Sequence, residues 1–502
     1  MISFMKGGFL MCKYIKTDIN LVPDTVNTSP DYYCTWQTQL YACCNSGPQG
    51  QRDNIDEVVL FNEKYPFGWI NFHEKARADL IFVMDDSWDV PYGEQKIGPN
   101  YGSLILDKHK FASFYKNSHE PKEAMKALSD AVKAKGWRGV GGWVCAHKAT
   151  VFDDTDEKTF YEERFRWSDY ADWKYWKIDW GYKAADSSYR RMLTEMRTNL
   201  APNLIAEQAI NNELIPESDV FRTYDVPALM SIPMTMEKLD AVLRFDAKEG
   251  YLALIDCEDE VYIAAALGCS MGVMRHPMTG NLPDGTPDPS FPALHRNIKT
   301  KMDEVTRAVR WHRIAPAFAV NGSNTYFDEN KLTDTWLIEN QASEIEAWWN
   351  FRDGDTVEKS GTARISRGMP LPDVTPDKNG LVPFVVCAKN PNGAVSVATL
   401  GRTMGREWIL PKCELTLDAG DATTIGVFGE YGVLRIKTTS AKDGCRVLMQ
   451  DLMSDVAFDV TEYVSVNDGT LEIPGNLIHE IGTSENGAND TSEPGLVIKV
   501  EN

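Results

Sequence analysis

Six acidic residues stand at or near the ends of short apolar runs in the first half of the chain. They are Asp85, Asp86, Asp179, Glu207, Asp225 and Asp256. If these runs are parallel strands of one barrel, their carboxyl ends share one face and the six carboxylates converge on one pocket. Two basic residues and four tryptophans would lie beside them: Lys177, Arg222, Trp36, Trp88, Trp143 and Trp180. For any single one of these acids, an ordinary polar position at the end of a strand is an equally good interpretation.

Two of the carboxylates suit the two roles of glycoside hydrolysis. In that reaction one carboxylate attacks or stabilises the anomeric carbon, and a second carboxyl group protonates the leaving oxygen. Asp179 stands two residues after Lys177. Because a nearby cation favours the ionised form, Asp179 is the candidate nucleophile. Asp225 stands three residues after Arg222 and is the candidate general acid.

Residues 175–181 show how a strand would present such side chains. Successive side chains of a strand point to opposite faces, so Trp176 and Ile178 share one side while Lys177 and Asp179 share the other. A strand covered by helices is apolar on both faces except at its carboxyl end, where side chains open into a site. Taken alone, the stretch also fits an ion pair on the wet face of an antiparallel sheet.

Eight apolar runs alternate with helix-like stretches between about residues 32 and 320, which indicates parallel strands with helical crossovers. The runs are residues 33–39, 79–84, 139–145, 175–181, 203–207, 220–225, 251–256 and 271–275. Eight such units in roughly 290 residues match the size of a (β/α)8 TIM barrel. A doubly wound open sheet is the alternative, but no glycine fingerprint opens a helix after the first run.

The character of the sequence changes beyond about residue 330. Pieces rich in Val, Ile, Thr and Phe are separated by turn signals such as Asn390-Pro391-Asn392-Gly393, which predicts a hairpin between two strands. We therefore predict an α/β protein with three parts. These are an N-terminal extension over residues 1–31, a catalytic (β/α)8 barrel over residues 32–325, and a C-terminal antiparallel β-sandwich domain over residues 326–502.

Composition narrows the classes of partner. The formal net charge is -21, which argues against a nucleic-acid partner because phosphate binding needs clustered Lys and Arg. The 14 tryptophans suit surfaces that stack on flat ligands such as sugars. The ten cysteines include no C-x-x-C pair, and the apolar part of the N-terminus is too short for a signal peptide. We expect a cytoplasmic protein with reduced thiols and no membrane partner, and a homo-oligomer remains open.

The sequence predicts neither a metal nor another cofactor. It holds eight histidines and no H-x-H or H-E-x-x-H motif, so a catalytic metal centre is not expected.

Four short motifs together resemble clan D of the glycoside hydrolases, which contains the retaining α-galactosidases of families 27 and 36. In chain order they are Asp85-Asp86-x-Trp88, Lys177-x-Asp179, Glu207 and Arg222-x-x-Asp225. The resemblance covers roughly residues 32 to 320 and rests on the order and spacing of the motifs. The chain departs from family 27 after the nucleophile position, where that family usually has Cys and this chain has Trp180-Gly181.

The resemblance implies a role for each matched residue. Asp179 is expected to be the nucleophile and Asp225 the general acid/base. The expected substrate-binding residues are Asp85 and Asp86 on the 4- and 6-hydroxyls of a terminal galactose, Lys177 on the 3- and 4-hydroxyls, Trp36 against the sugar face, and Glu207 at the 2-position. Trp143 and Arg222 are expected in the same pocket from their places near strand ends, not from the resemblance. The two catalytic carboxyl groups should lie about 5 to 6 Å apart, as in retaining enzymes.

The expected function is that of a retaining exo-acting α-glycosidase, foremost an α-galactosidase, which works by double displacement through a covalent glycosyl-aspartate. Its substrate would be an oligosaccharide or glycoside with a terminal α-linked sugar. Related activities stay open: β-L-arabinopyranosidase, α-N-acetylgalactosaminidase, an isomaltodextranase-like activity or transglycosylation. A non-catalytic sugar-binding barrel is the alternative from a different class, but both candidate carboxylates, Asp179 and Asp225, are present.

Overall fold

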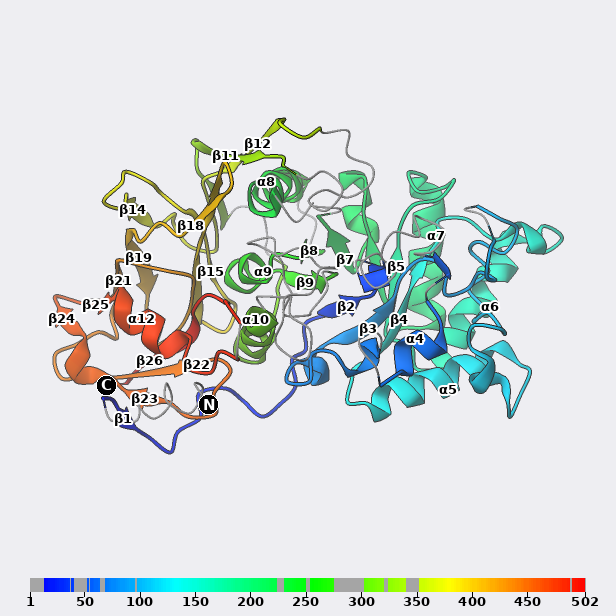
Figure 1. Ribbon diagram of the computed structural model, residues 1–502, viewed down its shortest axis with the longest axis horizontal. Helices are drawn as coiled ribbons and strands as arrows, with labels where there is room; N and C mark the ends of the chain where they lie inside the picture. The colour runs from blue at the N-terminus through cyan, green and yellow to red at the C-terminus, as the bar shows by residue number, and fades with distance from the viewer. Residues whose placement is uncertain are drawn as a thin grey trace.

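The computed structural model describes most of the chain. The described residues are 13–36, 38–39, 52–53, 55–63, 68–94, 97–223, 230–249, 253–274, 302–319, 324–339, 352–487 and 490–501. Within them, a closed barrel occupies one end of the molecule and layered sheets occupy the other (Figure 1).

Eight strands form the barrel, and each is hydrogen-bonded in parallel to the next until the last closes on the first. They are β2 (Tyr32–Cys34), β3 (Ile81–Met84), β4 (Gly139–Val144), β5 (Tyr175–Ile178), β6 (Ile205–Gln208), β7 (Val220–Arg222), β8 (Leu254–Glu258) and β9 (Ser270–Val273). Each strand overlaps one of the eight predicted runs. The predicted (β/α)8 fold is confirmed.

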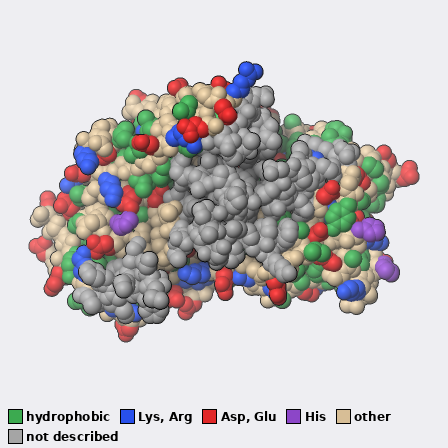
Figure 2. Space-filling view, in the orientation of Figure 1, with side chains coloured by type: hydrophobic (Ala, Val, Ile, Leu, Met, Phe, Trp, Pro, Cys, Tyr) green, Lys and Arg blue, Asp and Glu red, His purple; other side chains and the backbone are tan. Residues whose placement is uncertain are grey.

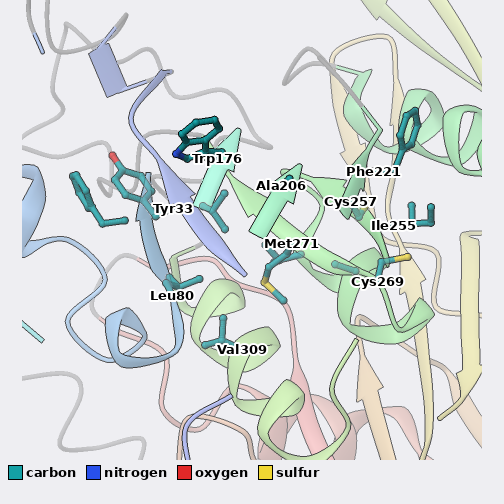
Figure 3. Packing of buried hydrophobic residues seen from close by; sticks show 14 of the residues in the cluster. Tyr33, Leu80, Trp176, Ala206, Phe221, Ile255, Cys257, Cys269, Met271 and Val309 are labelled. Atoms are coloured by element: carbon teal, nitrogen blue, oxygen red, sulfur yellow. The ribbon is translucent and has the colours of Figure 1, made fainter. Parts of the chain in front are cut away.

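The strand register places alternate side chains inside the barrel. Tyr175 and Lys177 of β5 point inward, whereas the Trp176 ring stacks on Phe165 of a covering helix with 4.2 Å between the ring centroids. Figure 3 shows part of the outward-facing layer, in which Trp176 and other apolar strand residues pack toward helices. The same alternation carries Asp179, two residues beyond Lys177, to the inner side of the barrel mouth.

Eight α-helices are described. They are α4 (Glu57–Phe61), α5 (Pro121–Ala134), α6 (Glu157–Tyr170), α7 (Ser187–Leu200), α8 (Ser231–Glu249), α9 (Val261–Leu267), α10 (Met302–Ile314) and α12 (Gly475–Gly482). Seven of them follow strands of the barrel, α12 lies in the C-terminal part, and the segment between β6 and β7 forms a 3-10 helix instead. Helix α7 is capped by Asp186, whose side chain accepts hydrogen bonds from the backbone N–H groups of Ser188 and Tyr189. This cap fixes the start of the helix directly after the loop that follows Asp179.

The C-terminal part forms two facing sheets with two short hairpins. The nine-stranded sheet has the order β1-β23-β22-β26-β20-β16-β15-β13-β10, and the five-stranded sheet has the order β14-β19-β21-β25-β24. Val397 and Ile425 of the first sheet share one buried cluster with Leu417 and Ile436 of the second, so the core lies between them. Most pairings are antiparallel, but β13–β15, β16–β20 and β19–β21 are parallel.

The bounds of these strands are β10 (Thr325–Phe327), β11 (Lys331–Leu337), β12 (Thr356–Thr362), β13 (Arg364–Arg367), β14 (Asp373–Thr375), β15 (Phe384–Lys389), β16 (Val395–Leu400), β17 (Arg402–Met404), β18 (Glu407–Ile409), β19 (Glu414–Gly420), β20 (Thr424–Phe428), β21 (Val433–Thr438), β22 (Arg446–Asp451), β23 (Phe458–Asp459), β24 (Ser465–Asn467), β25 (Thr470–Pro474) and β26 (Gly495–Glu501). The hairpin predicted at Asn390-Pro391-Asn392-Gly393 joins β15 to β16 and is confirmed.

Two contacts link the C-terminal sheet to earlier parts of the chain. The short strand β1 (Ile15–Lys16) pairs with β23, so the beginning of the described chain lies at the edge of the C-terminal sheet (Figure 1). Between the barrel and that sheet, Arg307 of α10 forms a two-point ion pair with Asp451 of β22, at 2.9 and 2.8 Å. Both side chains are fully buried. The barrel therefore docks firmly on the sheet.

The cysteines that the structure describes are all free and buried. Among the described residues, no helix combines the length and the apolar character needed to cross a membrane. Figure 2 shows acidic side chains dispersed over both halves of the visible face, with basic side chains among them.

Candidate active site

The barrel mouth collects seven of the nine predicted site residues in two linked groups. Asp85 follows β3 directly, Asp179 follows β5, and the others come from the strands or from the segment after β2. The residues gathered there are Trp36, Asp85, Trp143, Lys177, Asp179, Glu207 and Arg222. Asp86 lies beside this set and pairs with Arg52, and Asp225 lies outside the described residues.

Arg222 is the hub of the first group. Its guanidinium forms ion pairs with carboxylates from three other strand positions. The distances are 3.2 Å from Nη2 to Oδ1 of Asp179, 3.0 Å from Nε to Oε1 of Glu207 and 3.1 Å from Nη1 to Oε2 of Glu258. The guanidinium is planar with its donors in a fixed fork, so this arrangement fixes the orientation of all three carboxylates.

Asp179 is held from both sides. One oxygen pairs with Arg222, and the other accepts a hydrogen bond from the Trp143 indole Nε1 at 3.0 Å. Burial disfavours the charged form of Asp179, but Arg222 and Lys177 outweigh it and hold the pKa of Asp179 below its usual value. Asp179 is therefore an ionised carboxylate in a dry, fixed position, as a nucleophile requires.

Lys177 organises the second group. Its Nζ lies 2.7 Å from Oδ2 of Asp85, and the same oxygen accepts a hydrogen bond from the Cys34 thiol at 2.9 Å. Burial opposes the charge of Lys177, but Asp85 more than compensates and raises the pKa of the ammonium well above its usual value. The Asp85 backbone N–H donates to Thr35 Oγ1 at 2.8 Å. Asp85 and Lys177 thus form a rigid polar pair at the mouth.

Asp86 does not join this pair. Its Oδ1 accepts a hydrogen bond from Ser87 at 2.7 Å, and its Oδ2 lies 3.5 Å from Nε of Arg52. Burial raises the pKa of Asp86 even though Arg52 stands close by. Asp86 is buried beside Asp85, and the prediction that it binds a sugar hydroxyl stays a prediction. Trp36 is half-buried and packs against the apolar residues of the barrel interior, which places it over the mouth.

A layer of acids lies around Arg222 and deeper in the barrel. Glu207 accepts a hydrogen bond from Tyr175 at 2.7 Å, and burial raises the pKa of Glu207 to about 7 against the opposing effect of Arg222. Burial, with Glu207 and Glu258 nearby, raises the pKa of Asp256 well above its usual value. Space for these groups comes from Gly272, where a Cβ atom would stand 2.4 Å from the Tyr32 hydroxyl and 2.9 Å from Oδ1 of Asp256.

Glu258 and Cys34 are the site residues that the sequence reasoning missed. The seventh run was ended at Asp256, whereas β8 continues to Glu258. Extending the strand by one more inward position would have found Glu258, because its side chain is two residues from Asp256 and shares its face. The contact between Cys34 and Asp85 joins residues 51 positions apart, and no local pattern signals it.

The described residues contain no group of three or more His, Cys, Asp or Glu side chains placed to hold a metal ion. The two cations at the mouth, Lys177 and Arg222, are instead paired with carboxylates. The described residues at the mouth thus include an ionised carboxylate, Asp179, with two cationic neighbours.

Comparisons with known proteins give weak similarities. No protein-family model and no curated protein matches the chain. A variant of a family 27 β-L-arabinopyranosidase from Geobacillus stearothermophilus, solved with arabinose, is 8% identical over 94% of this chain and 97% of that chain, with a TM-score of 0.41. Alpha-galactosidase I from Mortierella vinacea is 12% identical over 94% and 96% of the two chains, with a TM-score of 0.37.

An alpha-amylase from Anoxybacillus is 10% identical over 94% of this chain and 98% of that chain, also with a TM-score of 0.37. The similar solved structures thus include a member of family 27, the family that the motifs resemble. At these identities and TM-scores, the similarity transfers no residue role to this chain.

Proposed function

We propose that the protein is a retaining, exo-acting α-glycosidase, with α-galactosidase as its leading activity. The observation that carries this proposal is the state of Asp179, a buried and ionised carboxylate held between Trp143 and Arg222 at the mouth of the barrel. Attack on an anomeric carbon needs a carboxylate that is charged, desolvated and fixed in direction. Asp179 meets these three conditions.

In the proposed first step, an Asp179 carboxylate oxygen forms a bond to the anomeric carbon while the bond to the leaving oxygen breaks. Asp225, assigned by its motif, donates a proton to that oxygen. Arg222 and Trp143 hold the attacking carboxylate in place, and water assisted by Asp225 later cleaves the glycosyl ester with retention of configuration. Every atom of this cycle is supplied by the chain, the glycoside and water.

The second group provides sugar recognition in this proposal. Asp85 and Lys177 form a fixed donor and acceptor pair at the same mouth. A pair of this kind suits adjacent hydroxyl groups of a terminal sugar, because one hydroxyl can donate to the carboxylate while its neighbour accepts from the ammonium. Trp36 offers an apolar ring above the barrel interior, against which the C–H face of a sugar can lie.

A panel of nitrophenyl α-galactoside, β-L-arabinopyranoside, α-N-acetylgalactosaminide and α-glucoside tests the proposal. We expect hydrolysis of at least one, foremost the α-galactoside, and NMR of the first product should show the anomer of the substrate. A matched control is Asp130→Asn, which changes an exposed carboxylate paired with Lys126 on α5 and should keep full activity. A folded protein that cleaves none of the four substrates would contradict the proposed function and favour sugar binding without catalysis.

A further inference from the structure

Five aromatic rings form a continuous wall from the nucleophile to the surface. We call Tyr101, Trp143, His147, Trp180 and Tyr182 the aromatic wall. The ring centroids are 5.4 Å apart for Tyr101 and Trp143, 5.7 Å for Tyr101 and Trp180, 6.2 Å for Tyr101 and His147, and 4.5 Å for His147 and Tyr182. The inner end of the wall is the Trp143 indole that donates to Asp179.

Exposure rises along the wall from the catalytic carboxylate outward. Trp143 is 2% exposed and His147 is 6% exposed, whereas Tyr182 is 72% exposed. A large aromatic side chain left this open in a monomer is a candidate for ligand contact, because most of its apolar surface stays in water otherwise. The wall thus begins at the reaction centre and ends in solvent.

The outer part of the wall is held by backbone hydrogen bonds. Ala146 donates its N–H to the carbonyl of Trp180 at 3.0 Å, and Lys183 donates its N–H to the carbonyl of Ala146 at 2.9 Å. Gly181 between them has φ of +156°, and a Cβ atom there would stand 2.7 Å from the Ala146 nitrogen. Only glycine lets the loop approach this closely. Tyr182 is therefore presented by a fixed loop.

His147 serves the wall as a neutral ring. Its Nδ1 accepts the Tyr182 backbone N–H at 3.3 Å and lies 3.1 Å from the Cys145 sulfur. Burial lowers the pKa of His147, which favours the uncharged imidazole. An uncharged ring packed at a tilt against Tyr182 puts no charge at the outer part of the wall, where a charge would attract water instead of an apolar sugar face.

From this geometry we infer that the aromatic wall is a subsite for the second sugar ring of an oligosaccharide, with Trp180 and Tyr182 as its platform. This inference rests on the proposed function, which places the terminal sugar at Asp179. Sugar rings have one face of C–H groups that stacks on aromatic rings while the hydroxyls at the rim stay hydrated. The wall selects oligosaccharides over simple glycosides, a preference that the residues around Arg222 and Lys177 do not supply.

The test compares binding of a disaccharide with that of a matched monosaccharide glycoside. Calorimetric titration of the Asp179→Asn protein with melibiose and methyl α-galactoside, and with isomaltose and methyl α-glucoside, gives a ratio of dissociation constants for each pair. In this background, Tyr182→Ala should raise the ratio of the disaccharide dissociation constant to the monosaccharide dissociation constant about tenfold, because one aromatic platform is lost.

Two further variants keep the test independent of folding. Tyr182→Phe keeps the ring and should restore the wild-type ratio. Tyr170→Ala removes an exposed tyrosine at the end of α6, outside the wall, and should leave the ratio unchanged. An unchanged ratio in Tyr182→Ala, or no measurable binding of any of the four sugars, would overturn the inference. Disaccharide binding that depends on Tyr182 without turnover by the wild-type protein would support the wall and contradict the proposed hydrolysis.

Discussion

Two buried arginines show how differently this molecule uses the same side chain. Arg307, between α10 and the C-terminal sheet, makes its ion pair with one carboxylate, Asp451. Arg222, at the barrel mouth, makes ion pairs with three carboxylates from β6, β8 and the end of β5. Both guanidinium side chains are fully buried. Equal burial with one ion pair against three suits a structural role for Arg307 and, in the proposed function, a chemical role for Arg222.

The difference appears in the protonation of the surrounding acids. Around Arg307, Asp451 is the paired carboxylate and raises the pKa of the guanidinium against the effect of burial, and Asp303 acts in the same direction. Around Arg222, surplus carboxylates compete for one cation. The pKa of Asp179 falls, that of Glu207 rises to about 7, and that of Asp256 rises well above its usual value. Buried ion pairs add little to stability, and acids whose pKa values are shifted in opposite directions cluster at functional sites.

The largest effect is expected from a substitution in the group around Arg222. Asp179→Asn removes the proposed nucleophile and should lower kcat/KM by at least about 10³-fold on the best substrate of the panel. The fold should persist because Arg222 keeps Glu207 and Glu258 as partners. Steady-state kinetics and thermal unfolding of the same preparation measure both quantities. Turnover within tenfold of the wild type would remove Asp179 from the mechanism.

The matching test of the structural arginine is Arg307→Met, which removes the ion pair and leaves Asp451 buried without its cation. Removing one partner of a buried pair should lower the free energy of unfolding by about 3–5 kcal/mol, while kcat of the folded fraction stays at its wild-type value. Denaturant titration measures the loss. The control is Arg244→Met, which breaks an exposed pair with Asp240 and should cost about 0.5 kcal/mol or less. Equal losses in the two variants would contradict the assigned structural role.

The raised pKa of Glu207 can be tested by measuring the free energy of unfolding at a series of pH values. The unfolded chain releases the Glu207 proton near pH 4.5, whereas the native state keeps it up to about pH 7. The native state binds more protons in this window, so the contribution of Glu207 to stability falls as the pH rises from 4.5 to 7 and is constant above. Glu207→Gln has no such proton to release. Its free energy of unfolding should therefore fall less than that of the wild type between pH 4.5 and 7, and the difference should reach up to about 3 kcal/mol. Parallel curves for the two proteins would show that Glu207 ionises normally.

The smallest expected effect concerns Cys34, whose thiol donates to the same Asp85 oxygen that Lys177 holds. Cys34→Ala removes one of these two donors and should raise KM about two- to tenfold with little change in kcat. Cys34→Ser keeps a donor of similar position and should lie closer to wild type. The readout is the separation of KM from kcat on one substrate. An equal fall of kcat in both variants would mean that Cys34 acts on packing alone.

The sequence was sufficient to predict the barrel and much of its site. The eight strands could be predicted because each apolar run ends in polar residues and is followed by a helix pattern, and the alternation at Lys177 and Asp179 correctly placed both side chains inside. Glu258 was missed because the run was ended one inward position too early. The triple pairing of Arg222 could not be predicted, since strands far apart in the sequence supply its partners.

The C-terminal part shows a second limit. Its strands and the β15–β16 hairpin follow local turn chemistry, but pairing partners depend on the whole fold. The two-residue strand β1 pairs with β23 more than 440 positions later, and Thr17 donates to the carbonyl of Ala457 at 2.8 Å. Neither short segment carries a periodic signal of its own. The parallel pairs within these sheets are likewise decided by connections that local patterns do not encode.

The most direct test of the central claim is to trap the covalent intermediate. An activated 5-fluoroglycosyl fluoride of the preferred sugar should accumulate as a glycosyl ester, and peptide mass spectrometry then locates the label. We predict a single labelled residue, Asp179, and no label in the Asp179→Asn protein. A label on another carboxylate such as Glu207 or Glu258, or turnover with inversion and no label, would contradict the account.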